Sequence, residues 1–140
     1  MAIILTPNKK PSKARRHTEE AIQAEAFMWI WNAHPETRGL YFSVLNETTP
    51  YRMNKEEQVV LGAMRRRRGV VAGVSDNILL MPNKRYHFCC AEGKTTERGS
   101  RQSEAQKAFQ SNVERVGGYY FIYRTISEFQ AEIERYLADI

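Results

Sequence analysis

Apolar residues recur along this chain at two spacings, one typical of helices and one typical of strands. Those from Ile22 to Ile30 recur at helical spacing, and Thr18 is a suitable N-cap just before them. This first helix should end before His34, because the residue preceding Pro35 disfavours helical backbone. A second helical pattern runs from Met53 to about Arg66.

β-branched and aromatic runs indicate strands at four places, namely Leu40–Leu45, Asn77–Met81, Tyr86–Lys94 and Tyr119–Arg124. The turn residues Pro82, Asn83 and Lys84 separate the second and third runs, which should therefore pair as a hairpin.

Two more helices are indicated near the end of the chain. Ser103 should cap one that runs to about Val116 and is closed by Gly117 and Gly118, and Ser127 should cap a last helix through Leu137. The expected order is α-β-α-β-β-α-β-α, an α/β fold with a mixed sheet flanked by helices.

Composition divides the chain into two parts. Residues 7–16 (PNKKPSKARR) hold five basic residues, two prolines and no acid, so residues 1–17 are interpreted as a flexible basic arm that is either a solvated tail or a phosphate-binding segment. The length of 140 residues allows one real core, and residues 18–140 are expected to form a single domain.

Net charge and cysteine content indicate the kind of binding partner and the cellular compartment of the protein. A net charge of +5 favours an acidic partner, with nucleic acid the leading candidate. Cys89 and Cys90 are adjacent, which suits neither a disulfide nor a metal site and indicates a reducing compartment. No stretch approaches the roughly 20 apolar residues of a membrane span. A cytoplasmic protein is expected.

The residues that are candidates for catalysis lie on the predicted hairpin. Asp76 opens one strand and Glu92 lies late in the other, so the hairpin should bring them together. Glu92 and Lys94 are two apart and should share a face. Carboxylates that hold Mg²⁺ beside a lysine meet the two demands of phosphodiester hydrolysis, which are charge neutralisation and an activated water. The alternative is a surface ion pair between Glu92 and Lys94 on an edge strand.

Several motifs together resemble the VRR-NUC branch of the PD-(D/E)xK nucleases. They are the opening helix Thr18-Glu19-Glu20-Ala21-Ile22-Gln23, the strand end Leu45-Asn46-Glu47, the run Gly69-x-x-x-Gly73-Val74-Ser75-Asp76, then Glu92-Gly93-Lys94, and Ser103-Glu104-Ala105-Gln106. The resemblance spans about residues 18–126 and implies the restriction-endonuclease-like fold.

The resemblance also implies roles for individual residues. Asp76 and Glu92 would bind the catalytic Mg²⁺ or Mn²⁺ with the Gly93 carbonyl, and Lys94 would orient or activate the attacking water. Glu19 would approach the metal directly or through water, although Glu20 is an alternative. Gln106 would position water or phosphate, Gln23 could share the face of Glu19, and Asn46 belongs to the family's Asn-containing strand.

The chain departs from the family pattern at two positions. Ser75 stands where the family usually has proline, and Gly93 stands where it prefers an apolar residue. Ser75 should shape the backbone rather than bind metal, and Gly93 would contribute only its carbonyl, so the activity should survive both changes.

Arginines cluster beside the proposed site. Arg65, Arg66, Arg67 and Arg68 lead toward the loop that carries Asp76, and Arg98 and Arg101 follow Lys94. A solvated face is the ordinary explanation for such a run, but its position favours contact with a DNA backbone.

The sequence therefore predicts a Mg²⁺- or Mn²⁺-dependent DNA endonuclease of a bacterial or phage-infected cell. The resemblance implies a homodimer that cuts branched DNA such as four-way (Holliday) junctions. Flaps, single-stranded ends or duplex DNA are alternative substrates, and a non-catalytic DNA-binding module is the alternative of another class.

Overall fold

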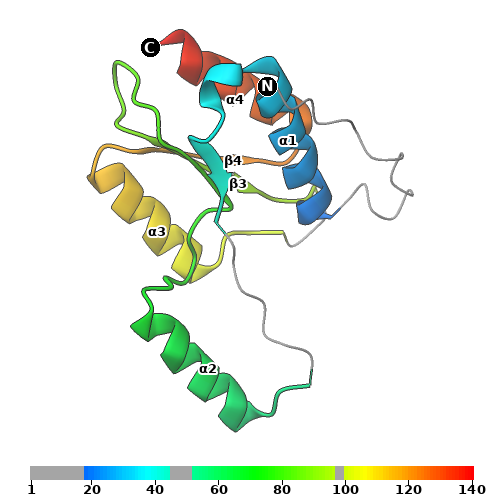
Figure 1. Ribbon diagram of the computed structural model, residues 1–140, viewed down its shortest axis with the longest axis vertical. Coiled ribbons are helices and arrows are strands. Elements are labelled where there is room, and N and C mark those ends of the chain that lie inside the picture. The colour runs from blue at the N-terminus through cyan, green and yellow to red at the C-terminus, as the bar shows by residue number, and fades with distance from the viewer. Residues whose placement is uncertain (1–17, 45–51, 97–99) are drawn as a thin grey trace.

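The computed structural model describes residues 18–44, 52–96 and 100–140. Its elements follow the predicted order, with one short 3-10 helix added after the first helix (Figure 1). They are α1 (Glu19–Ala33), η2 (Pro35–Thr37), β1 (Tyr41–Ser43), α2 (Lys55–Arg67), β2 (Asn77–Leu79), β3 (Cys89–Gly93), α3 (Glu104–Arg115), β4 (Tyr119–Tyr123) and α4 (Ile126–Ala138). The predicted α/β class is confirmed. The predicted arm, Leu45 and Asn46 lie outside the described residues.

The four strands form one mixed sheet in the order β1-β2-β3-β4. β2 pairs antiparallel with both β1 and β3, so the predicted hairpin is confirmed, whereas β3 and β4 are parallel and need α3 as their crossover. Helices α1 and α4 lie on one face of the sheet and α3 on the other (Figure 1).

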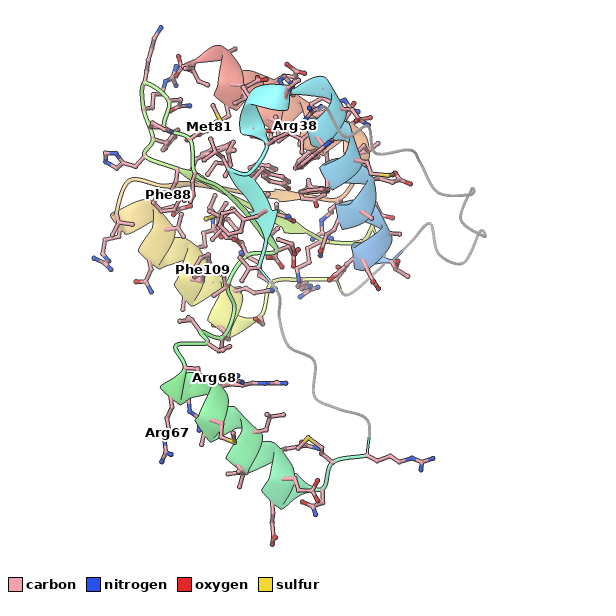
Figure 2. All side chains as sticks on the ribbon, viewed as in Figure 1. Arg38, Arg67, Arg68, Met81, Phe88 and Phe109 are labelled. Carbon is pink, nitrogen blue, oxygen red and sulfur yellow. The ribbon has the colours of Figure 1, made fainter. Side chains whose placement is uncertain are left out.

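Two apolar clusters fix these layers. The larger joins α1 and α4 to the sheet through side chains such as Ile30, Tyr123 and Phe129. The smaller joins α3 to the opposite face, where Phe88 and Phe109 pack around Cys90, Val113 and Tyr120 (Figure 2). Both faces of the sheet are therefore covered, and the strand ends are where polar side chains from several elements meet.

Local signals set most helix ends. Thr18 and Ser103 cap α1 and α3 as predicted. The prediction of Ser127 as the last cap is wrong, because α4 begins two residues earlier and Thr125 accepts the N–H of Glu128.

All four strands are shorter than predicted, β4 by only one residue. β3 begins at Cys89 rather than Tyr86, because the Asn83 side chain accepts the backbone N–H groups of Arg85 and Tyr86 and holds this stretch in a turn. β1 and β2 cover three residues each, although backbone hydrogen bonds from Val44 to Asp76 and from Leu80 to Leu40 continue their pairing.

Helix α2 differs from the rest of the described chain. It stands away from the sheet, joined to it by the segment that leads to Asp76, and none of its residues is buried (Figures 1 and 2). Val59, Val60 and Met64 are more than half exposed on it. Among the described helices, none is long and apolar enough to cross a membrane.

Candidate active site

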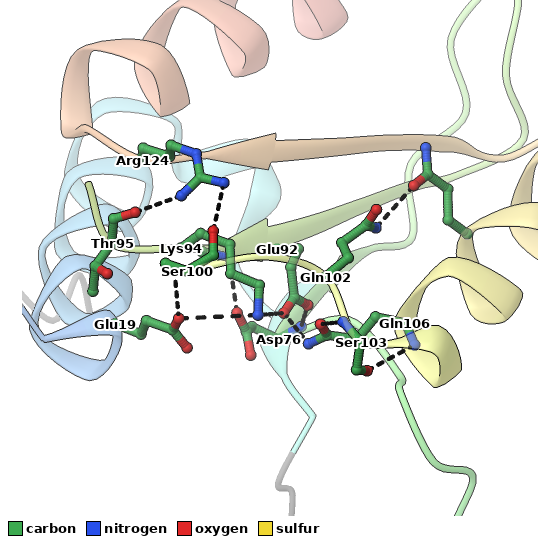
Figure 3. A network of polar contacts seen from close by, with 12 residues as sticks. Glu19, Asp76, Glu92, Lys94, Thr95, Ser100, Gln102, Ser103, Gln106 and Arg124 are labelled. Atoms are coloured by element: carbon green, nitrogen blue, oxygen red, sulfur yellow. Dashed lines mark hydrogen bonds and ion pairs between the residues drawn. The ribbon is translucent and has the colours of Figure 1, made fainter. Parts of the chain in front are cut away.

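Polar side chains from several segments of the chain meet at one end of the sheet (Figure 3). The antiparallel β2–β3 pair brings the start of β2 to the end of β3, and the parallel β3–β4 pair adds the end of β4. The first turns of α1 and α3 lie at the same end, because Glu19 and Gln106 contact residues of this group.

Asp76 and Glu92 are tied together by reciprocal hydrogen bonds. The backbone N–H of Asp76 donates to Oε2 of Glu92 at 3.2 Å, and the N–H of Gly93 donates to Oδ2 of Asp76 at 2.8 Å. The two carboxylates therefore meet as the hairpin predicted, each held by the other's strand.

Gln106 reaches Glu92 because a capping box fixes its amide. Its Oε1 accepts the N–H of Ser103 at 2.9 Å, while the Ser103 hydroxyl accepts the N–H of Gln106. The amide nitrogen is left to donate, and it does so to Oε1 of Glu92 at 2.6 Å. The start of α3 thus aims a defined donor at the site.

Lys94 and Glu92 share a face, as predicted. The Lys94 ammonium lies 3.5 Å from Oε1 of Glu92 and 3.9 Å from Oε1 of Glu19, and the Glu19 carboxylate also accepts a hydrogen bond from Ser100. The exposed fractions are 1% for Glu92 and 7% for Lys94. The surface ion-pair alternative is therefore wrong.

Burial sets the electrostatics of the two carboxyls. Desolvation, followed by the nearby charge of Asp76, raises the pKa of Glu92 from 4.5 to about 7, although Lys94 acts in the opposite direction. Desolvation also raises the pKa of Asp76, while hydrogen bonds from Gly93 and Gln23 lower it. A bound cation would add to the effect of Lys94 and favour the ionised form of both carboxylates.

The donor set suits a hard cation. No group of three or more His, Cys, Asp or Glu side chains in the described residues is arranged to hold a metal. Asp76 and Glu92 offer two carboxylates, and Mg²⁺ commonly binds to one or two carboxylates and keeps several waters. The residues present therefore fit Mg²⁺ or Mn²⁺ through Asp76 and Glu92, with Glu19 turned toward Lys94 and Ser100.

Ser75 and Gln23 take supporting positions. Ser75 is fully buried and its hydroxyl donates to the carbonyl of Asn77, so it shapes the backbone beside Asp76. Gln23, one turn after Glu19, reaches Asp76 from α1. Glu20 is exposed, whereas Glu19 contacts Lys94, so the structure brings Glu19 rather than Glu20 to the site.

The predicted DNA-binding arginines are placed less closely around the two carboxylates than the other predicted site residues. Arg65 to Arg67 form the last turn of α2 and Arg68 is its C-cap, at the end of this helix nearest the sheet (Figure 2). There they also complement the negative end of the helix dipole. Arg101 is exposed just before α3. Arg98 and Asn46 lie outside the described residues.

Two residues to which the sequence analysis gave no role in the site hold it together. The guanidinium of Arg124 donates to the carbonyls of Thr95 and Ser100, at 2.5 and 2.8 Å, and so fixes the chain after Lys94 (Figure 3). Gly73 packs on the start of α3, where a Cβ would lie 2.3 Å from the Ala105 carbonyl carbon. Arg124 follows a strand end, a signal that could have located it at this edge.

Comparisons with known proteins agree with this architecture. No family model matches the sequence, and no curated protein matches it either. Among solved structures, one described as a "VRR_NUC domain protein" superposes with a TM-score of 0.69 at 20% sequence identity, covering 87% of this chain and 89% of that one. The resemblance drawn from the motifs is thus confirmed for the fold, and this chain has the fold of that VRR_NUC domain protein.

Proposed function

We propose that this protein is a divalent-metal-dependent nuclease that hydrolyses phosphodiester bonds in DNA. The observation that carries the proposal is the burial of Glu92 and Lys94 beside Asp76 at one end of the sheet. The fold shared with a VRR_NUC domain protein supports it. A module that only binds DNA gains nothing from buried carboxylates facing phosphates, because like charges repel.

Asp76 and Glu92, with the Gly93 carbonyl, would hold Mg²⁺ or Mn²⁺. The bound ion would neutralise charge on the phosphate and lower the pKa of a bound water. Lys94 orients the attacking water and stabilises the charge that develops on the phosphoryl oxygens. Its ammonium is held between Glu92 and Glu19, which keeps it beside the carboxylates.

Gln106 and the arginines serve the substrate. Gln106 holds Glu92 by a 2.6 Å hydrogen bond and is the donor placed to position water or phosphate. The Arg65–Arg68 run and Arg101 would supply positive charge for the phosphate backbone.

A matched pair of variants tests the activity. Glu92→Ala and Lys94→Ala should each lower cleavage by about 100-fold or more, because they remove groups at the reacting centre. Glu104→Ala and Lys107→Ala are the controls, since they remove an exposed ion pair on nearby α3, at 3.1 Å, and should leave cleavage unchanged.

The assay uses labelled four-way junction, flap, single-stranded and duplex DNA, each with Mg²⁺, with Mn²⁺ and with EDTA. Metal-dependent cleavage that both site variants lose would support the proposal, and the preferred DNA would identify the substrate. Binding without cleavage under every metal condition would contradict it and favour the DNA-binding module.

We further propose that the active form is a homodimer acting on branched DNA, where two sites related by a two-fold axis suit paired cuts. Helix α2 supports this, because a lone helix with exposed Val59, Val60 and Met64 needs a partner.

A further inference from the structure

Three buried polar side-chain atoms have no hydrogen-bond partner among the described residues. They are the hydroxyls of Tyr41 and Tyr123 and Oδ1 of Asn77. The register places all three side chains on the sheet face covered by α1 and α4, because Tyr41 pairs with Leu79, two residues from Asn77, and Tyr123 pairs with Gly93. Unpaired buried polar atoms are uncommon and call for an explanation.

Tyr123 lies directly below Gly93. A Cβ built on Gly93 would stand 3.1 Å from the Tyr123 hydroxyl oxygen and 3.2 Å from its Cζ, with Cγ of Gln23 at 3.4 Å. The space that a side chain at position 93 needs is therefore filled from beneath by the tyrosine. This accounts for a glycine between Glu92 and Lys94, where the resemblance leads one to expect an apolar residue.

The hydroxyl of Tyr123 does not stabilise the fold. Tyr123 is fully buried against Phe129, at 4.9 Å between ring centroids, and its unpaired O–H makes it less favourable than phenylalanine at this position. Burial, and then the charges of Asp76 and Glu92, raise its pKa, so the hydroxyl stays protonated within electrostatic reach of both carboxylates.

We infer that Tyr123 is a positioning residue for the cation site, acting through the backbone of Gly93. Its hydroxyl fills the space on the Cβ side of Gly93, whose N–H holds Oδ2 of Asp76 at 2.8 Å. The inference rests on the proposed metal-dependent function.

Tyr123→Phe tests it by Mn²⁺ titration calorimetry and by thermal unfolding in EDTA. The Kd for Mn²⁺ should rise about tenfold, as for other groups that orient metal ligands, while the Tm stays equal or rises. Tyr136→Phe is the control at the far end of β2, where the hydroxyl donates to the carbonyl of Met81 at 2.6 Å. It should lower the Tm and leave the Kd unchanged.

A second measurement introduces Gly93→Ala into the wild type and into Tyr123→Phe and compares the two losses of Mn²⁺ binding. Alone it should weaken Mn²⁺ binding, because its Cβ meets Tyr123, and the loss should be smaller in Tyr123→Phe, where one of the two crowding atoms is gone. Wild-type binding with an unchanged Kd in Tyr123→Phe, or additive losses, would overturn the inference alone. A wild-type protein that binds no Mn²⁺ would overturn the proposed function and the inference together.

Discussion

Apolar side chains are usually buried and charged ones exposed. The end of the sheet that carries Asp76 and Glu92 and helix α2 depart from this rule in opposite directions. At the site, Glu92 and Lys94 are 1% and 7% exposed. On α2, Val59 and Val60 are 65% and 59% exposed. One region buries charge at a cost in solvation, and the other leaves apolar surface in water.

Under the proposed function, a different partner explains each exception. The buried carboxylates, whose pKa values are raised, would bind a metal cation, whereas the apolar face of α2 would pack against a second copy of the chain. The remaining elements follow the ordinary rule, since α1, α3 and α4 bury their apolar sides against the sheet. Variants that alter one exception without the other test whether the two regions serve separate tasks.

Among variants outside the group of Asp76, Glu92 and Lys94, the largest effect is expected from Gly73→Ala. Gly73 has φ of 79°, and a Cβ there would lie 2.4 Å from the carbonyl oxygen of Ala105 and 2.6 Å from the backbone nitrogen of Gln106. The start of α3 must shift, and Gln106 then loses its contact with Glu92. We expect a loss of about 3 kcal/mol in unfolding free energy by denaturant titration, with cleavage reduced about 100-fold.

Gly69→Ala is the matched control. Gly69 has φ of 86° but no atom within 4 Å of an added Cβ, so the variant carries the backbone strain without the clash. It should cost about 1 kcal/mol and leave cleavage near the wild-type rate. Equal losses of activity in the two variants would contradict a specific role for the contact with α3.

The next effect concerns α2. Val60→Asp should be nearly neutral for the folding of one chain, because Val60 is already exposed, but it would bury a charge in a dimer. Analytical ultracentrifugation should show a dimer dissociation constant about 100-fold higher than that of the wild type. Leu80→Asp, at a site 54% exposed on the sheet domain, should leave the dimer intact.

Function in the dimer is tested by mixing subunits. Wild-type protein combined with inactive Glu92→Gln subunits should give mostly single nicks on a junction held in a cruciform. Paired cuts at the wild-type level in such mixtures, or a monomeric wild-type protein, would contradict the homodimer.

Sequence reasoning predicted the parts of the site that depend on local signals. The hairpin turn at Asn83 implied that Asp76 and Glu92 meet, and the alternation of a strand placed Lys94 beside Glu92. The same reasoning predicted α2 from its apolar pattern. It gave no sign that this helix would stand apart, because periodicity reports that a face is apolar and not what covers it.

The features that were missed depend on pairing between distant segments. The parallel register of β3 and β4 sets Tyr123 under Gly93 and Arg124 beside Thr95, and no local pattern encodes that register. The contact of Gly73 with Ala105 likewise joins a loop to a helix that follows two strands later. Ser127 was chosen over Thr125 because both are good caps and only the packed position of α4 distinguishes them.

The smallest expected effect is the pH dependence of the metal-free protein. The pKa of Glu92 is raised from 4.5 to about 7 by burial and then by Asp76, so between these pH values the folded chain keeps a proton that the unfolded chain has lost. Raising the pH through this window therefore lowers the free energy of unfolding. In EDTA, the Tm of the wild type should fall by a few degrees relative to Glu92→Gln, which cannot titrate.

Adding Mg²⁺ sharpens this comparison. A cation favours the ionised form of Glu92, so the ion should remove most of the wild-type fall in Tm and leave Glu92→Gln nearly unchanged. Helix α2 has no part in this titration, and Val60→Asp should therefore show the wild-type pH profile. Parallel pH profiles of the wild type and Glu92→Gln in EDTA would mean that burial of Glu92 does not perturb its protonation, and the electrostatic argument for a cation at this end of the sheet would fail.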